Sequence, residues 1–579
     1  MDSADQVSQS QTPERVPGGW KSVKYILGNE TFEKMAAMSL MANLVLYLRN
    51  MYNLDNITSI NIAIIWSGFS NFLPLVGAFI ADAYLGKFNT VLCGTISSLL
   101  GMATMTLTAG LPSLRPSHCD GQSNCHNPAH PWQMAILYIS LGFIAIGAGG
   151  IRPCNISFGA DQFDTATEKG KQQLASFCNW YFFLFTVAII FVLTGVTYVQ
   201  TNVSWFFGFL IPTFCFIFSI AVFLFGRHTY ILVKPQGSIF LDMVKVIVAA
   251  FRKRSTINVG KPPFYDPIVS DEIKLARTSR LRFFDKGAMI VDPSEVDSNG
   301  KSKNSWRLCT VQNVEQLKSM LTIVPVLITV VGCFIPMSQP GTFGILQAIQ
   351  MNRTIGKKGF QIPPAWVNLT IMLTLSIWVF FYEKIYIPVL EKRRKKNNVR
   401  LTVTQRLNIG IILSIICMVV AGIVEKKRRE SALKHGSFEA PMSVFYLMLP
   451  FALAGLVEAF AAVTLMEHLT TRWPERMRTV AGGIFFLSLS VSSYLNSIIV
   501  EVIDKVTATN GRSPWLSGDN FNKNRLDYYY YVIGGVGVLN LVYFHVSAKH
   551  YLGGSRVADD SELAESKDSE EGLAMKEIV

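Results

Sequence analysis

Residues 204–225 read SWFFGFLIPTFCFIFSIAVFLF, an apolar stretch that contains no charged side chain. An α-helix needs about 20 apolar residues to cross the hydrocarbon core of a bilayer. Comparable runs recur along the chain, six before a long polar break and six after it. The pattern predicts an all-α polytopic membrane protein with 12 transmembrane helices in two six-helix halves. The expected spans cover residues 29–50, 60–82, 89–112, 132–158, 176–200, 204–225, 316–338, 364–389, 402–424, 442–468, 479–503 and 527–549.

Composition supports this class of protein. Half of the 579 residues are apolar and 16% are charged, whereas soluble domains carry about 25% charged residues. The net charge of +13 lies mostly between the apolar runs, which indicates a lipid bilayer rather than nucleic acid as partner. The polar N-terminus does not have the pattern of a signal peptide. Without a P-loop, hydrolase or kinase signature, we expect neither an enzyme nor a cofactor.

Five segments are expected along the chain. They are an N-terminal cytosolic segment 1–25, a first bundle 26–225, a basic cytosolic central loop 226–315, a second bundle 316–550 and an acidic, disordered tail 551–579. The short apolar run 237–251 predicts an amphipathic helix that lies at the membrane surface or caps the bundle. The positive-inside rule places both termini in the cytosol. The basic run 426–429 is an exception to this rule, because the predicted order of spans places it on the outer side of the membrane.

The first expected span begins with three ionisable residues, Glu30, Glu33 and Lys34. Their spacing places them on neighbouring positions of one helical face. Each ionisable group inside a span costs at least about 2.5 kcal/mol, so its presence requires a reason. Two carboxylates beside one cation can hold and release a proton, which predicts a proton-coupling site. The alternative is a solvated helix end.

Two more charges lie within expected spans, one in each half. Arg152 follows two glycines and precedes a proline, and such a loosened backbone is tolerated where it borders a cavity or a neighbouring helix. The permanently charged, planar guanidinium suits an anion. Glu458 lies midway along the tenth span and needs a partner or a proton. We expect the two residues to meet at the midplane as the charged floor of a substrate site. A snorkelling arginine and a purely structural ion pair are the alternatives.

Two loops contain further candidate residues. Asp82, Gly86 and Lys87 follow the second span, and a carboxylate and a lysine around a glycine turn predict a latch that gates conformational change. Cys119 and Cys125 share a polar loop that the cytosolic-termini arrangement places outside. A disulfide between them is expected in an oxidising compartment.

Several longer motifs are distributed along nearly the whole chain. They are PGGW at 17–20, GNETFEK at 28–34, FGADQFD at 158–164, FCNWYFF at 177–183, RFFDK at 282–286, WRLCTVQ at 306–312, PERMR at 474–478 and NKNRLD at 522–527. In this order they resemble plant members of the nitrate/peptide transporter family, the proton-dependent oligopeptide transporter group of the major facilitator superfamily. The chain is most similar to the branch that holds low-affinity nitrate carriers and carriers of glucosinolates and other glucosides. The resemblance implies a major facilitator fold and import driven by protons.

The resemblance also implies roles for individual residues. The family's ExxE[R/K] proton motif is filled by Glu30, Glu33 and Lys34, with lysine in place of the commoner arginine. The cation of the fourth span and the acid of the tenth span are matched by Arg152 and Glu458.

In the seventh span, Met337 and Gln339 are the expected substrate-binding residues. Met337 stands where the best-known nitrate carrier has a histidine, so a histidine contact cannot be transferred to this chain. The positions typical of peptide carriers are also changed, which disfavours peptide transport.

The leading interpretation is a proton-coupled symporter for low-affinity nitrate transport. Alternatives are a carrier of a glucoside or plant hormone, a transporter-like nitrate sensor, and a passive channel, against which the Glu30–Glu33 pair argues. Thr90 matches the threonine whose phosphorylation tunes a dual-role family member, so a cytosolic kinase is an expected partner. A helix-capping threonine is the simpler explanation. The plasma membrane is the expected location, ahead of the vacuolar membrane.

Overall fold

The computed structural model describes residues 18–116, 129–163, 167–233, 237, 239–255, 263–267, 277–297, 300–355, 360–394, 401–472, 478–508, 514–518 and 520–553. The expected disulfide between Cys119 and Cys125 and the acidic tail beyond Gly553 lie outside the described residues.

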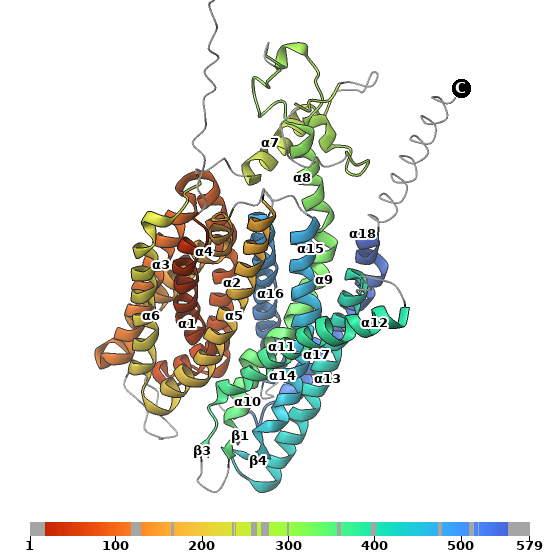
Figure 1. Cartoon of the computed structure of the whole chain (residues 1–579). Coiled ribbons are helices and arrows are strands. Elements are labelled where there is room, and N and C mark those ends of the chain that lie inside the picture. Colours follow the sequence, from red (N-terminus) through yellow and green to blue (C-terminus); the bar gives the residue numbers. More distant parts are fainter. Residues whose placement is uncertain are drawn as a thin grey trace, which may run out of the picture.

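Long helices follow one another through the chain and form two bundles (Figure 1). The first bundle contains α1 (Gly19–Tyr52), α2 (Asn56–Ile80), α3 (Gly86–Gly110), α4 (Pro131–Ala160), α5 (Glu168–Phe191) and α6 (Trp205–Phe225). The second contains α8 (Val311–Thr322), α9 (Val324–Gln339), α10 (Ile345–Ile349), α11 (Leu369–Phe381), α12 (Ile387–Arg394), α13 (Val403–His435), α14 (Met448–Val457), α15 (Val463–Arg472), α16 (Arg478–Thr507), α17 (Leu526–Tyr543) and α18 (Lys549–Gly553).

Shorter elements join these helices. The π-helical turns are η1 (Ala81–Leu85), η3 (Val192–Val196), η4 (Val199–Val203), η8 (Pro340–Gly344), η10 (Tyr382–Tyr386), η12 (Glu458–Ala462) and η15 (Phe544–Ala548). The short strands are β1 (Met351–Asn352), β2 (Thr354–Ile355), β3 (Phe360–Gln361) and β4 (Ala440–Ser443), with β2 antiparallel to β3 and β1 parallel to β4.

The predicted number of spans is confirmed by the helices. Within the described residues, 10 helical segments are long and apolar enough to cross a membrane. One of them, Asn56–Gly110, extends over 55 residues and contains both α2 and α3. Counting these separately gives 11, and the 34-residue α1 gives 12. The hydropathy criterion misses α1 because charged and amide side chains are buried along it.

Close packing in the first bundle depends on small residues between α3 and α4. A Cβ atom at Gly147 would lie 1.9 Å from Oγ of Ser98, so only glycine fits at this helix contact. Gly150 faces the backbone of α3 in the same way, with an added Cβ 2.8 Å from the carbonyl oxygen of Thr90. The glycines before Arg152 therefore permit the approach of two helices, and the arginine lies two residues after Gly150.

The two ends of the bundles differ, and we name them by their elements. The hairpin side contains the β2–β3 hairpin and the turn between α1 and α2. The central-segment side contains α7 (Ile239–Arg252) and the start of α8, and α1 begins and α18 ends there (Figure 1). The expected amphipathic helix is thus present as α7. Its buried residues are Met243, Val246, Ala249 and Ala250, and because α7 packs against α8 and η6 (Phe284–Gly287), its inner face covers the protein's own chain.

The basic run 426–429 is not a loop, contrary to our expectation. Helix α13 continues to His435, where Gly436 ends it with a left-handed conformation. Arg428 is fully buried and its guanidinium lies 2.8 Å from the carboxylate of Glu425, one helical turn earlier. Arg428 therefore does not count as a loop charge under the positive-inside rule, whereas the exposed Lys426 and Lys427 still oppose the predicted orientation.

Candidate functional site

Three charged residues of α1 form a compact buried cluster. Nζ of Lys34 lies 3.3 Å from Oε1 of Glu30 and 3.0 Å from Oε2 of Glu33. All three side chains are at most 8% exposed. Because residues three and four apart share a helix face, the spacing of the motif produces this contact. Two carboxylates share one ammonium group, so the cluster carries one surplus negative charge when both are ionised.

The two carboxylates differ in the hydrogen bonds that they receive from neighbouring helices. Glu30 accepts a 2.5 Å hydrogen bond from the Tyr181 hydroxyl of α5 and another from the Asn155 amide of α4. Among the described side chains, Lys34 alone contacts the carboxylate of Glu33. Glu30 is therefore held by Tyr181, Asn155 and Lys34, whereas Glu33 is held by Lys34 among the described side chains.

Arg152 lies between the two bundles. Its guanidinium donates to Oδ1 of Asn71 at 2.7 Å and to the carbonyl oxygen of Ser70 at 3.4 Å, both on α2. Its guanidinium carbon also lies 5.6 Å from the ring centroid of Phe486 on α16, in the second half. The positive charge is close enough to act on Glu33 and Glu30. The arginine thus extends from the bundle that contains the Glu30–Glu33–Lys34 cluster to the interface between the halves.

The expected ion pair between Arg152 and Glu458 is absent from the described part of the chain. Glu458 begins the π-helical turn η12 and is partly buried, but no side-chain hydrogen bond or ion pair of a described residue reaches it. The physical reason is that Asn71, in the arginine's own half, supplies an acceptor at hydrogen-bond distance. In this conformation, Arg152 is therefore held by Asn71 of its own half and lies near Phe486 of the second half.

Gln339 was expected to bind substrate, and in this structure its side chain is engaged by residues of the second half. Its side chain is fully buried, and its amide donates to the carbonyl oxygen of Ile335 and to Oδ1 of Asn496. Its Oε1 accepts from the hydroxyl of Tyr529 at 3.0 Å. Both amide protons are thus used within the second half, so Gln339 joins α9, α16 and α17. Met337 is partly buried and packs against the apolar core of the same half.

The predicted latch after the second span has a different partner. Nζ of Lys87 lies 2.6 Å from Asp161 at the end of α4, rather than beside Asp82. Gly86 has a φ of 74°, which glycine adopts without strain. Burial raises the pKa of the Asp161 carboxyl above its usual value, and the Lys87 ammonium opposes that rise. Asp161 therefore takes up a proton at less acid pH than an ordinary aspartate, so acid pH weakens this ion pair.

Thr90 is not exposed in this structure. It lies inside the first turns of α3, is 5% exposed, and donates its hydroxyl to the carbonyl oxygen of Gly86 at 2.9 Å. A kinase would reach it only after the start of α3 opens. The capping explanation is also wrong, because α3 begins at Gly86 and Thr90 lies beyond the capping position.

The sequence analysis missed four residues of this site: Asn71, Asn155, Tyr181 and Phe486. Tyr181 lies within the motif at 177–183, so its motif was recognised without its role. Asn71 and Asn155 are polar residues inside apolar spans, which is the signal that could have identified them. Phe486 has no such signal, because apolar aromatic residues are ordinary in membrane helices.

Twelve membrane-crossing helices in two bundles, with a buried charge cluster reaching their interface, define a polytopic membrane transporter of the major facilitator type. The chain belongs to the POT family, whose model matches residues 88–516.

Relatives and solved structures agree with this assignment. The chain is 51% identical over 539 residues to Protein NRT1/PTR FAMILY 2.8 of Arabidopsis thaliana, covering 92% of this chain and 95% of that protein. It is 41% identical over 560 residues to Protein NRT1/PTR FAMILY 2.12 of the same plant, covering 95% of each. The fold is similar to the crystal structure of the POT family transporter PepTSo, with a TM-score of 0.65, 18% identity, and coverage of 93% and 99% of the two chains.

Proposed function

We propose that this transporter is a proton-coupled symporter of a small anion, with low-affinity nitrate transport as the first function to test. A glucosinolate or another anionic glucoside is the second substrate class. The observation that carries the proposal is the position of Arg152, which lies in the same bundle as the Glu33 carboxylate and reaches the interface between the halves.

The arrangement supports coupling in both directions. While Glu33 is ionised, its negative charge stabilises Arg152 and opposes the arrival of an anion at the guanidinium. Protonation of Glu33 removes that charge and leaves Arg152 free to attract an anion. A bound anion in turn repels an ionised Glu33 and favours its protonation. Such reciprocal effects typically amount to about 1–3 kcal/mol, a factor of roughly 5–150 in affinity.

The guanidinium has donors left for a substrate. Nη1 is directed to Asn71 and Ser70, while Arg side chains present five N–H donors in a planar fork. The remaining edge can form paired hydrogen bonds to two oxygens of a planar anion such as nitrate or a carboxylate. The Phe486 ring lies against one face of the guanidinium. The substrate therefore approaches the N–H edge of the guanidinium and not this face.

The sidedness of transport is also part of the proposal. With Arg428 buried, the basic residues of the central segment favour placing that side in the cytosol. The hairpin side then faces the outside, and an acid exterior supplies the protons. The plasma membrane is the proposed location.

The test is uptake of labelled nitrate and of a glucoside panel into oocytes at acid and neutral external pH. We expect uptake of one anionic substrate to exceed that of water-injected oocytes and to rise at acid pH, because protons and anion enter together. The amount of protein at the cell surface is measured in parallel. Uptake that is equal at both pH values would reject proton coupling, and uptake of neutral glucosides alone would reject the anion role of Arg152.

A further inference from the structure

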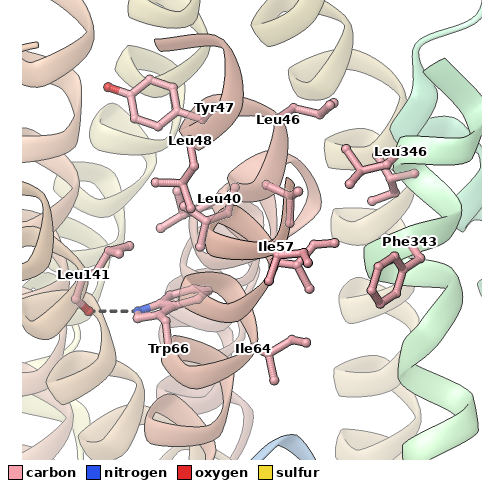
Figure 2. Packing of buried hydrophobic residues seen from close by; sticks show 14 of the residues in the cluster. Leu40, Leu46, Tyr47, Leu48, Ile57, Ile64, Trp66, Leu141, Phe343 and Leu346 are labelled. Carbon is pink, nitrogen blue, oxygen red and sulfur yellow. Dashed lines mark hydrogen bonds between the residues drawn. The ribbon is translucent and has the colours of Figure 1, made fainter. Parts of the chain in front are cut away.

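On the hairpin side, the two halves meet through an apolar contact. Phe343 and Leu346 of the second half belong to the same buried cluster as Leu46, Ile57 and Ile64 of α1 and α2. Figure 2 shows these side chains in the region where the two sets of helices approach each other. A transporter that alternates between two openings has to separate this contact once in each cycle.

The short helix α10 carries Leu346 and continues from α9 in one helical segment, Val311–Ile349. Between them lies the π-helical turn η8 (Pro340–Gly344), which contains Pro340, Gly341 and Gly344. Sharp changes of helix direction occur at prolines, glycines and π-bulges. The η8 turn is therefore a point at which α10 can bend relative to α9, so contacts made by α10 itself help to fix its direction.

Gln347, the residue after Leu346, supplies that contact. It is 2% exposed, and its amide nitrogen donates to Oε2 of Glu425 on α13 at 2.6 Å. Its carbonyl oxygen accepts from the hydroxyl of Tyr530 on α17 at 2.9 Å. One side chain thus joins α10 to two long helices of its own half.

The acceptor on α13 is held rigidly in place. Arg428 donates through Nε to Oε2 of Glu425 and through Nη2 to Oε1, each at 2.8 Å. Its Nη1 donates to Oδ1 of Asn522 at 2.7 Å, in the segment before α17. Both charged side chains are fully buried. A buried ion pair contributes little net stability compared with apolar residues, whereas its paired geometry orients the groups bound to it.

We propose that Gln347 is a positioning residue that fastens α10 to the Glu425–Arg428 pair and thereby holds the hairpin-side contact between the halves closed. The ion pair is the fixed anchor, and the Gln347 amide is the link that ties the end of this helical segment to it. When this link is lost, α10 pivots at η8 and takes Phe343 and Leu346 away from the first half. The inference rests on the assignment as a transporter and not on the identity of the substrate.

The test measures how accessible the closed contact is. Ile57 is 9% exposed in this contact, so an Ile57→Cys variant of the full-length protein reports its opening. The purified protein is treated with a water-soluble maleimide well below its unfolding temperature, and modification is quantified by mass spectrometry on the peptide that contains residue 57. Adding Gln347→Ala is expected to raise the labelling rate roughly tenfold, the effect of losing one hydrogen bond to a charged group.

A charge exchange separates positioning from a loss of folding. Gln347→Glu sets two carboxylates against each other and is expected to give the fastest labelling. Combining it with Glu425→Gln restores a carboxylate–amide pair and is expected to return labelling toward the rate of Ile57→Cys alone. Thr342→Ala is the matched control, since its hydroxyl bonds only to carbonyl oxygens of its own helix among the described residues.

Two results would overturn the proposal. The first is unchanged labelling in Gln347→Ala while its unfolding temperature falls, which would make the contact a purely structural one. The second is equal labelling in Gln347→Glu and in its combination with Glu425→Gln. Leu46→Cys, at a position that is 3% exposed, repeats the measurement from α1 and replaces Ile57→Cys if that variant does not fold.

Discussion

Glu33→Gln is expected to abolish acid-stimulated uptake while leaving the protein folded and at the membrane. Glutamine keeps the shape of the side chain and cannot exchange a proton. In the structure, Lys34 is the contact of the Glu33 carboxylate among the described side chains, so the variant mimics the protonated state permanently. The ratio of uptake at acid pH to uptake at neutral pH is expected to fall by a factor of roughly 5–150 and to approach one.

The control for this prediction is another carboxylate of the same membrane domain. Glu467 on α15 pairs with Arg406, and its side chain is 38% exposed, so Glu467→Gln is expected to retain acid stimulation. For both variants, uptake is measured as a function of external pH and divided by the amount of protein at the cell surface. Full acid stimulation in Glu33→Gln would remove this residue from the coupling mechanism and turn attention to Glu30.

Arg152→Ala is expected to eliminate anion transport. The variant loses the charged donors that reach the interface between the halves and leaves Asn71 without its 2.7 Å partner. A hydrogen bond to a charged group contributes about 1.5–3 kcal/mol, so substrate affinity is expected to fall roughly ten- to a hundredfold. Binding of the identified anion to purified protein, measured at constant pH, separates this loss from an effect on coupling.

A double-mutant comparison with Glu458 tests whether Arg152 and Glu458 interact. If Arg152 and Glu458 formed an ion pair, removing both charges together would cost less than the sum of the two single changes. The structure contains no such contact among its described residues, so the binding effects of Arg152→Ala and Glu458→Gln are expected to add within about 0.5 kcal/mol. A larger interaction would show that the pair forms in another state of the cycle. Unchanged anion affinity in Arg152→Ala would reject the proposed site itself.

The transmembrane architecture was predictable because the bilayer imposes it locally. A membrane-spanning segment has to satisfy its own backbone hydrogen bonds, so apolar runs of sufficient length become helices wherever they occur. The same local logic explains the contact of Lys34 with Glu30 and Glu33, since three- and four-residue spacing brings side chains together on any α-helix. These features required no knowledge of how the bundles pack.

Other features depended on which helices lie next to one another. Nothing in the spacing of the chain shows that Asn71 would bind Arg152, 81 residues later, or that Tyr181, 151 residues away, would hold Glu30. Gln339 has the polarity of a substrate ligand, yet its hydrogen bonds are consumed by Asn496 and Tyr529.

The basic run on α13 illustrates the same limit. Its sequence looks like an external loop. Helical spacing pairs Arg428 with Glu425 on α13, and only tertiary packing brings Asn522 to the same guanidinium. Hydropathy and helical spacing therefore predicted the spans and the first-helix charge cluster. Tertiary packing selected the partners of Arg152 and Glu30 on other helices, because a buried polar group binds whichever partner a neighbouring helix places within hydrogen-bond distance.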